Sequence, residues 1–232
     1  MLLLLPNLLD ETTSVAQLLP ASVGEAVRTI QGLIAESEKG GRAYLKLFGV
    51  APQKMPIRVL SEHTTKEELD ELLSLLKKGE RWGLVSDCGL PCLADPGADL
   101  VLRARQMNLP IQAFVGPSSI TLALMLSGLS GQKFTFHGYL EREEEKLSRQ
   151  IRALEKLSAQ EKETQLCIEA PYRSPKLLGQ LLQHLSDKTL LSVAWDLTLP
   201  TETVITQPVS VWKKKPLPDL TKKPAIFLFF SN

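Results

Sequence analysis

The sequence predicts an α/β protein made of two domains, and three observations support this prediction. Short apolar runs alternate with helical patterns, a spacing typical of mainly parallel sheets. The chain has 232 residues with 44% hydrophobic and 23% charged residues, which is ordinary for a globular protein of this size. A Gly-Pro-Ser-Ser run interrupts the pattern at 116–119, so we expect an N-terminal domain over 1–115 and a C-terminal domain over 116–232.

The N-terminal half contains the clearer strand and helix signals. Residues 65–78 place leucines on one stripe, with Thr64 or Thr65 as a cap and Gly79 just after, and residues 98–107 repeat the helical spacing. Because glycine costs about 1 kcal/mol in a helix interior, the helix that follows the second strand is expected to begin after Gly41. The predicted strands are 2–5, 32–35, 57–60, 82–85 and 111–115.

The C-terminal half repeats the alternation with longer elements. Residues 120–129 are strongly apolar, and 141–157 combine many charged residues with one apolar side, so both predict helices. A third helix is expected over 175–185. The predicted strands are 133–140, 164–169, 190–195, 203–206 and 225–230.

The charge and cysteine content restrict the function. A formal net charge of +1 creates no global field for a polyanion, so nucleic-acid binding requires a local basic patch. Lysines at 213–215 and 222–223 are the candidate, although such a cluster is also consistent with a solvated loop. Three cysteines without a metal-like grouping with histidine predict reduced thiols and no metal. The apolar start ends at Pro6, too soon for a signal peptide or membrane span, so we expect a cytoplasmic protein.

The most informative segment is Ser86–Gly97, with two aspartates, two prolines and two glycines directly after an apolar strand. It therefore lies at the carboxyl end of a strand and leads into a helix, where open α/β sheets bind ligands. Glycine and proline allow such a loop to present backbone groups in a fixed array, and Asp87 and Asp95 are expected to support it. The same residue types also occur in ordinary surface turns.

The pattern S-D-x-G-x-P-x-x-x-D-P-G resembles the signature loop of the tetrapyrrole methylase superfamily. It is most similar to the branch that methylates a cytidine ribose 2′-hydroxyl in small-subunit ribosomal RNA. Two departures are a missing glycine in the first loop, where Leu8 and Leu9 follow Asn7, and Tyr172 in place of a histidine. Further similar segments are 114–120, 134–140, 168–173 and 196–203.

The resemblance implies S-adenosylmethionine (SAM) bound in a cleft between two α/β domains with mixed, mainly parallel sheets. It also implies a homodimer and small-subunit ribosomal RNA as the partner, with no membrane. The alternatives are a tetrapyrrole or protein substrate, or a module with the same fold that binds SAM or RNA without catalysis. The residues expected to bind the cofactor are Pro6, Gly89, Leu90, Pro91, Leu93, Ser118, Ser119, Ile120, Glu169, Ala170, Leu197, Pro224 and Ala225.

Methyl transfer from a sulfonium is an in-line displacement, so alignment supplies much of the rate and few catalytic side chains are needed. A ribose hydroxyl still benefits from a proton acceptor. The candidate catalytic residues are His63, Glu36 and Asp87, and Glu169 is a further possible acceptor. Arg42 and Arg173 are expected to bind substrate, or alternatively to pair with Glu36 and Glu169.

Overall fold

The computed structural model describes residues 1–231 and divides into two compact units. Unit 1 comprises residues 1–118 and unit 2 begins at Ser119. This division falls within the Gly-Pro-Ser-Ser run that interrupts the sequence pattern. Each unit contains one five-stranded sheet covered by helices, which confirms the predicted α/β class.

The sheet of unit 1 is parallel throughout, in the order β3-β2-β4-β1-β5. The carboxyl ends of its strands therefore share one edge, and the β1 and β4 ends are neighbours. The strands are β1 (Leu2–Leu4), β2 (Gly32–Ala35), β3 (Ile57–Val59), β4 (Trp82–Val85) and β5 (Ile111–Ala113).

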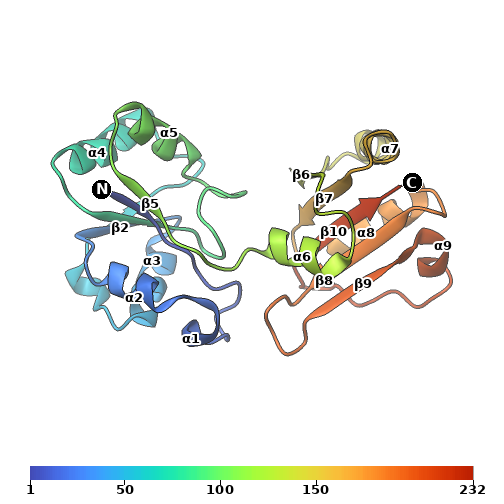
Figure 1. Cartoon of the computed structure of the whole chain (residues 1–232), viewed down its shortest axis with the longest axis horizontal. Helices are drawn as coiled ribbons and strands as arrows, with labels where there is room; N and C mark the ends of the chain where they lie inside the picture. The colour runs from blue at the N-terminus through green and yellow to red at the C-terminus, as the bar shows by residue number, and fades with distance from the viewer. Residues whose placement is uncertain (232) are drawn as a thin grey trace. The chain divides into compact units, whose positions relative to one another are not determined.

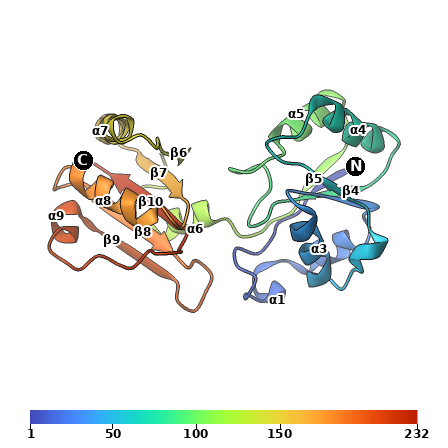
Figure 2. The same ribbon diagram turned by 180° about the vertical axis from the view of Figure 1, so that it is seen from behind.

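Helices cover both faces of this sheet, as Figures 1 and 2 show from opposite sides. Successive residues of a strand face opposite layers, so Leu33 lies in the cluster with α2 and α3 while Ile34 lies in the cluster with α4 and α5. This explains why the strands are apolar without alternation. The helical elements are α1 (Val15–Leu18), α2 (Ala21–Val27), α3 (Glu38–Leu47), η1 (Pro52–Lys54), α4 (Lys66–Lys77) and α5 (Ala98–Gln106).

The expected start of α3 after Gly41 is wrong, because the helix begins at Glu38 and includes both glycines. Ser37 caps it by accepting a hydrogen bond from the Gly40 backbone N–H at 3.0 Å. A Cβ at Gly40 would lie 2.3 Å from Asp87 Oδ1, and one at Gly41 would lie 3.1 Å from Ala35 Cβ. Close packing therefore favours glycine at 41, whereas at 40 the neighbour is the end of the exposed Asp87 side chain.

The sheet of unit 2 has the order β6-β7-β10-β8-β9 and is mixed. Only β6 and β7 pair in parallel, and the other three pairs are antiparallel. This sheet is more antiparallel than the alternation of strands and helices predicted. The strands are β6 (Phe134–Tyr139), β7 (Thr164–Glu169), β8 (Leu190–Trp195), β9 (Thr203–Pro208) and β10 (Ala225–Phe230).

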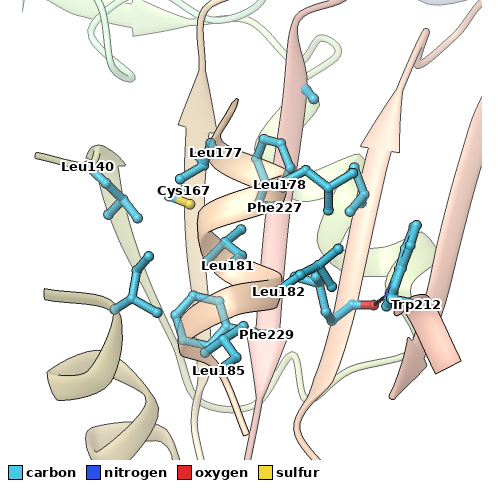
Figure 3. Close-up of a cluster of buried hydrophobic side chains, with 14 of the residues drawn as sticks. Leu140, Cys167, Leu177, Leu178, Leu181, Leu182, Leu185, Trp212, Phe227 and Phe229 are labelled. Carbon is cyan, nitrogen blue, oxygen red and sulfur yellow. Dashed lines mark hydrogen bonds between the residues drawn. The ribbon is translucent and has the colours of Figure 1, made fainter. Parts of the chain in front are cut away.

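The core of unit 2 lies between this sheet and three helices, α7 (Glu144–Glu161), α8 (Ser174–His184) and α9 (Val209–Trp212). Figure 3 shows the leucines of α8 lying over Phe227 and Phe229 of β10. Trp212 is buried at the end of α9, and its indole N–H donates to the Leu191 carbonyl at 2.9 Å. Helix α6 (Ser119–Ser127) packs against β8, β9 and β10. Over residues 1–231, every helix is too short or too polar to span a bilayer.

Candidate functional site

The loop of residues 86–97, between β4 and α5, has an unusual backbone. Gly89, Cys92, Ala94 and Gly97 all have positive φ, at 71°, 67°, 67° and 124°. A Cβ at Gly97 would lie 2.8 Å from Leu84 Cδ2, so this turn needs glycine for space as well as conformation. Within the described chain, the backbone groups of residues 90–96 form no hydrogen bonds with other backbone groups. That this loop presents its backbone groups to a ligand stays a prediction of the sequence.

The start of this loop is tied to the segment that follows β1. The Asn7 side-chain amide donates to the Ser86 carbonyl at 3.0 Å and to the Asp87 carbonyl at 2.9 Å. The Asn7 backbone N–H donates to the Gly89 carbonyl at 2.7 Å, and the Gly89 N–H donates to the Leu8 carbonyl at 3.2 Å. The N–H and the carbonyl of Gly89 therefore both have partners within the protein. A ligand at this loop would contact the residues around Gly89 and not its backbone amide.

Two further contacts fix the segment after β1. The buried Tyr44 hydroxyl donates to the Pro6 carbonyl at 3.1 Å, and burial raises the pKa of that phenol. A Cβ at Gly116 would lie only 2.1 Å from Pro6 Cβ, so the chain after β5 passes directly against Pro6. The Pro117 carbonyl lies 3.6 Å from the Cβ position of Gly89. The segments after β1, β4 and β5 thus form one continuous surface at the carboxyl edge of the sheet.

Three carboxylates, Glu36, Asp87 and Asp95, form a cluster at this edge. Burial and the neighbouring charges of Asp95 and Asp87 raise the pKa of Glu36, and burial together with the Asp87 charge raises the pKa of Asp95. Glu36 Oε1 is buried and makes no hydrogen bond within the described residues. Such a carboxylate takes up a proton more readily than an exposed one, as general acid–base chemistry requires.

The structure separates the other candidates of unit 1 from this cluster. The His63 side chain is 86% exposed, and its Nε2 lies 3.5 Å from Glu62. A hollow of ≈ 470 Å³ runs between residues 60–64 and 94–100, but His63 is outside its lining. Arg42 pairs with Glu38 at 2.8 Å, one turn earlier on α3, and not with Glu36 as one sequence alternative proposed. The predicted proton acceptors that come together are therefore Glu36 and Asp87.

In unit 2, the predicted residues of β7, β8 and β10 and of the segments next to them lie at one edge of the sheet. Glu169 ends β7 and pairs in register with Ala225 at the start of β10. The fully buried Glu169 side chain lies 3.0 Å from Arg173 and also accepts the Ala170 N–H at 2.8 Å. This is the pairing that the sequence offered as an alternative to substrate binding by Arg173. Pro224 precedes β10, Leu197 is buried just after β8, and Ile120 is buried in α6 next to Ser119.

The turn after β8 holds a second group of constrained residues. Asp196 and Thr198 have positive φ, at 54° and 73°, which is rare for a β-branched residue such as threonine. The Glu202 carboxylate accepts the Thr198 N–H at 2.9 Å, and Thr201 donates its hydroxyl to Asp196 at 3.0 Å. Lys223 forms an ion pair with Asp196. The acidic-Leu-Thr segment therefore adopts one fixed turn beside the predicted cofactor contact Leu197.

The expectation that the lysines form one basic patch is wrong. Lys213 pairs at 2.7 Å with Asp187, which precedes β8, whereas Lys223 pairs with Asp196, which follows β8. A six-residue strand is about 20 Å long, so the two lysine runs lie at opposite ends of the sheet. Proximity in the sequence misleads here because the chain between the runs crosses from one edge of the sheet to the other.

Sequence reasoning missed Asn7 and Tyr44, which shape the site without belonging to the matched loop. Asn7 stands directly after Pro6 at a predicted strand end, and this position was the only available signal. Tyr44 gave no signal, because its partner is a backbone carbonyl 38 residues away. Within residues 1–231, His, Cys, Asp and Glu side chains form no group of three or more that could hold a metal ion.

Comparison with known proteins places this geometry in a family. The model for Tetrapyrrole (Corrin/Porphyrin) Methylases matches residues 13–211. The chain belongs to this family. The resemblance drawn from the 86–97 loop is thereby confirmed at the family level.

Relatives and solved structures agree with this assignment. Ribosomal RNA small subunit methyltransferase I of Thermotoga maritima is 29% identical over 202 residues, which cover 85% of this chain and 87% of that protein. The Bacillus subtilis protein of the same name is 29% identical over 80% of this chain, but the match covers only 62% of its length. Diphthine synthase has the same fold, with a TM-score of 0.62, 14% identity, and coverage of 99% of this chain and 89% of the other.

Proposed function

We propose that this chain is a SAM-dependent methyltransferase that methylates a ribose 2′-hydroxyl of small-subunit ribosomal RNA. The family supports methyl transfer, and the names of the relatives support the RNA substrate. The observation that carries the proposal is the 86–97 loop: its backbone groups at 90–96 make no hydrogen bonds to other backbone groups, and it lies beside the carboxylate cluster Glu36, Asp87 and Asp95. The resemblance further predicts a homodimer, which light scattering would measure.

The residues of unit 1 fit SAM in both charge and shape. SAM supplies an activated methyl group on a positively charged sulfur when bound. Acidic side chains at 36, 87 and 95 favour a cationic ligand over an anionic one. The backbone groups of residues 90–96, which make no hydrogen bonds to other backbone groups, can bind the polar atoms of the adenosine and methionine parts. We assign Leu90, Pro91 and Leu93 to cofactor contact, and Pro6 and Gly89 to shaping the approach.

Glu36 is the residue that we propose accepts the proton of the attacking hydroxyl. In methyl transfer the Glu36 carboxylate would take up the O–H proton of the ribose, and bound SAM would supply the methyl group. Burial, together with the charges of Asp95 and Asp87, keeps the pKa of Glu36 high, so that the carboxylate is a better base than an ordinary glutamate. His63 and Arg42 are left as candidate RNA contacts on the exposed surface.

Two measurements test the proposal. Calorimetry with SAM measures cofactor binding, and transfer of a labelled methyl group to small ribosomal subunits from a methylation-deficient strain measures activity. Nucleoside digestion and mass spectrometry then distinguish ribose from base methylation. Glu36→Gln should bind SAM and lose transfer, while Glu71→Gln, which removes an exposed carboxylate on α4, should retain both. SAM binding without transfer to ribosomal subunits would refute the RNA substrate, and absence of SAM binding would refute the cofactor.

A further inference from the structure

The hydrogen bonds of Asn7 join two loops that the sequence separates by about eighty residues. Both hydrogens of its side-chain amide are used, on the carbonyls of Ser86 and Asp87, and its Oδ1 accepts the Leu8 N–H at 2.8 Å. An asparagine side chain offers two donor hydrogens and one acceptor oxygen, so little of this capacity remains for a ligand. Asn7 therefore acts on the protein and not directly on a bound molecule.

We propose that Asn7 is a positioning residue that holds the start of the 86–97 loop so that Asp87 stays beside Glu36 and Asp95. The two carbonyls that Asn7 binds belong to consecutive peptide groups, and fixing both fixes the backbone on each side of the Asp87 Cα. The direction of the Asp87 side chain follows from that backbone. The consequence for methyl transfer rests on the function proposed above, whereas the consequence for loop geometry does not.

A clamp is needed at this position because the neighbouring charges repel one another. Glu36 comes from the end of β2, and Asp87 and Asp95 come from the loop after β4, so the loop lowers its electrostatic energy by moving away from β2. Among the described residues, the ion pairs of unit 1 leave all three carboxylates without a cationic partner. The four hydrogen bonds that Asn7 and Gly89 form between the two segments oppose this movement.

The Cys88 thiol reports on this geometry without any substrate. It follows Asp87 directly and is an exposed, free cysteine. Partial burial raises its pKa, and so do the charges of Asp95, Glu36 and Asp87, which are the titratable groups that face it. If the loop relaxes, these charges separate and the thiol is better solvated. The pKa of Cys88 then falls.

The first test measures the rate of Cys88 alkylation by iodoacetamide as a function of pH, with the Cys88 peptide quantified by mass spectrometry. In Asn7→Ala we expect the midpoint of this profile to move to lower pH. Asn7→Ser, which keeps one donor hydrogen, should give a smaller shift. The control is Gln31→Ala, which removes a side-chain bond to the Arg81 backbone just before β4, at the opposite edge of the same sheet. It should match the wild type.

The second test measures methyl transfer by the same variants. The acid limb of the pH–rate profile should move to lower pH in Asn7→Ala, because Glu36 loses neighbouring negative charge, and kcat should fall about tenfold more than in Gln31→Ala. The alkylation and methyl-transfer rates of each variant are divided by its folded fraction, which circular dichroism measures. An unchanged Cys88 profile in folded Asn7→Ala or Asn7→Ser would overturn the positioning role. Wild-type protein that transfers no methyl group would instead refute the proposed function, and the thiol profile would still decide the role of Asn7.

Discussion

Gly40→Ala separates the stability of unit 1 from the geometry of its site. The new Cβ would lie 2.3 Å from Asp87 Oδ1 and 3.1 Å from Ser37 Oγ, so Asp87 must turn away. Asp87 is exposed and can rotate at little cost, while alanine is better than glycine in a helix by up to about 1 kcal/mol. We therefore expect the free energy of unfolding to remain constant or rise, with a midpoint increase of no more than roughly 2–4 °C.

Methyl transfer should respond in the opposite direction. With the Asp87 carboxylate displaced, Glu36 loses part of the charge that raises its pKa, and we expect at least about a tenfold loss of rate, or 1.4 kcal/mol of barrier. Thermal melting and labelled methyl transfer measure the two effects on the same sample. Gly41→Ala is the matched control, since its Cβ would lie 3.1 Å from side-chain carbons of Ala35, which is buried, and of Ile57, which is partly buried. Overpacking should destabilise it by about 1–3 kcal/mol.

The two variants should therefore show opposite patterns. A Gly40→Ala protein that keeps the wild-type rate would show that the position of Asp87 is irrelevant to catalysis. A Gly40→Ala protein less stable than Gly41→Ala would show that Asp87 cannot move aside, and the steric argument would fail.

Three other substitutions test separate parts of the site. Gly89→Val places a β-branched residue at a φ of 71° and should abolish SAM binding in calorimetry, whereas Asp95→Asn should weaken it less; equal affinities would remove the loop from the cofactor site. Burial raises the pKa of Glu36 in the folded protein, so this carboxyl destabilises the fold as the pH rises through that pKa. Glu36→Gln should therefore raise the melting temperature at pH 8 more than at pH 5. An effect that does not depend on pH would contradict the burial of Glu36. Arg173→Ala should lower the free energy of unfolding, measured in urea, by about 3–5 kcal/mol, because it leaves the buried Glu169 carboxylate without a partner. Adding Glu169→Gln should recover most of that loss. No recovery would indicate that Arg173 serves only substrate.

The sequence was most informative where local pattern determines structure. Each of the ten predicted apolar runs overlaps a strand, and the capped leucine stripe at 65–78 becomes α4 with a complete capping box at Thr65 and Glu68. These features depend on residues close in the chain. The Ser-Asp-Cys-Gly loop after β4 was found for the same reason, since its composition is itself unusual.

The errors concern contacts between distant segments. The low helix propensity of glycine suggested that Gly40 lies outside the helix. The sequence could not show that Gly40 lies next to Asp87, because Asp87 is 47 residues later in the chain. The antiparallel pairing of β10 with β7 and β8 leaves no local mark, because the alternation of apolar residues is the same for both directions. The separation of Lys213 from Lys223 likewise follows from the sheet order and not from spacing.

The place of β10 in its sheet has a consequence for how the protein is made. Of the strands in this sheet, Ala225–Phe230 is synthesised after the other four, yet it lies in the middle, between β7 and β8. Until residue 230 has left the ribosome, the earlier strands of unit 2 form two separate pairs with unsatisfied edges and an open core. Unit 1 has all its strands by residue 113 and can fold during synthesis. A chain interrupted between residues 119 and 224 would keep unit 1 with its carboxylate cluster but lose the second sheet.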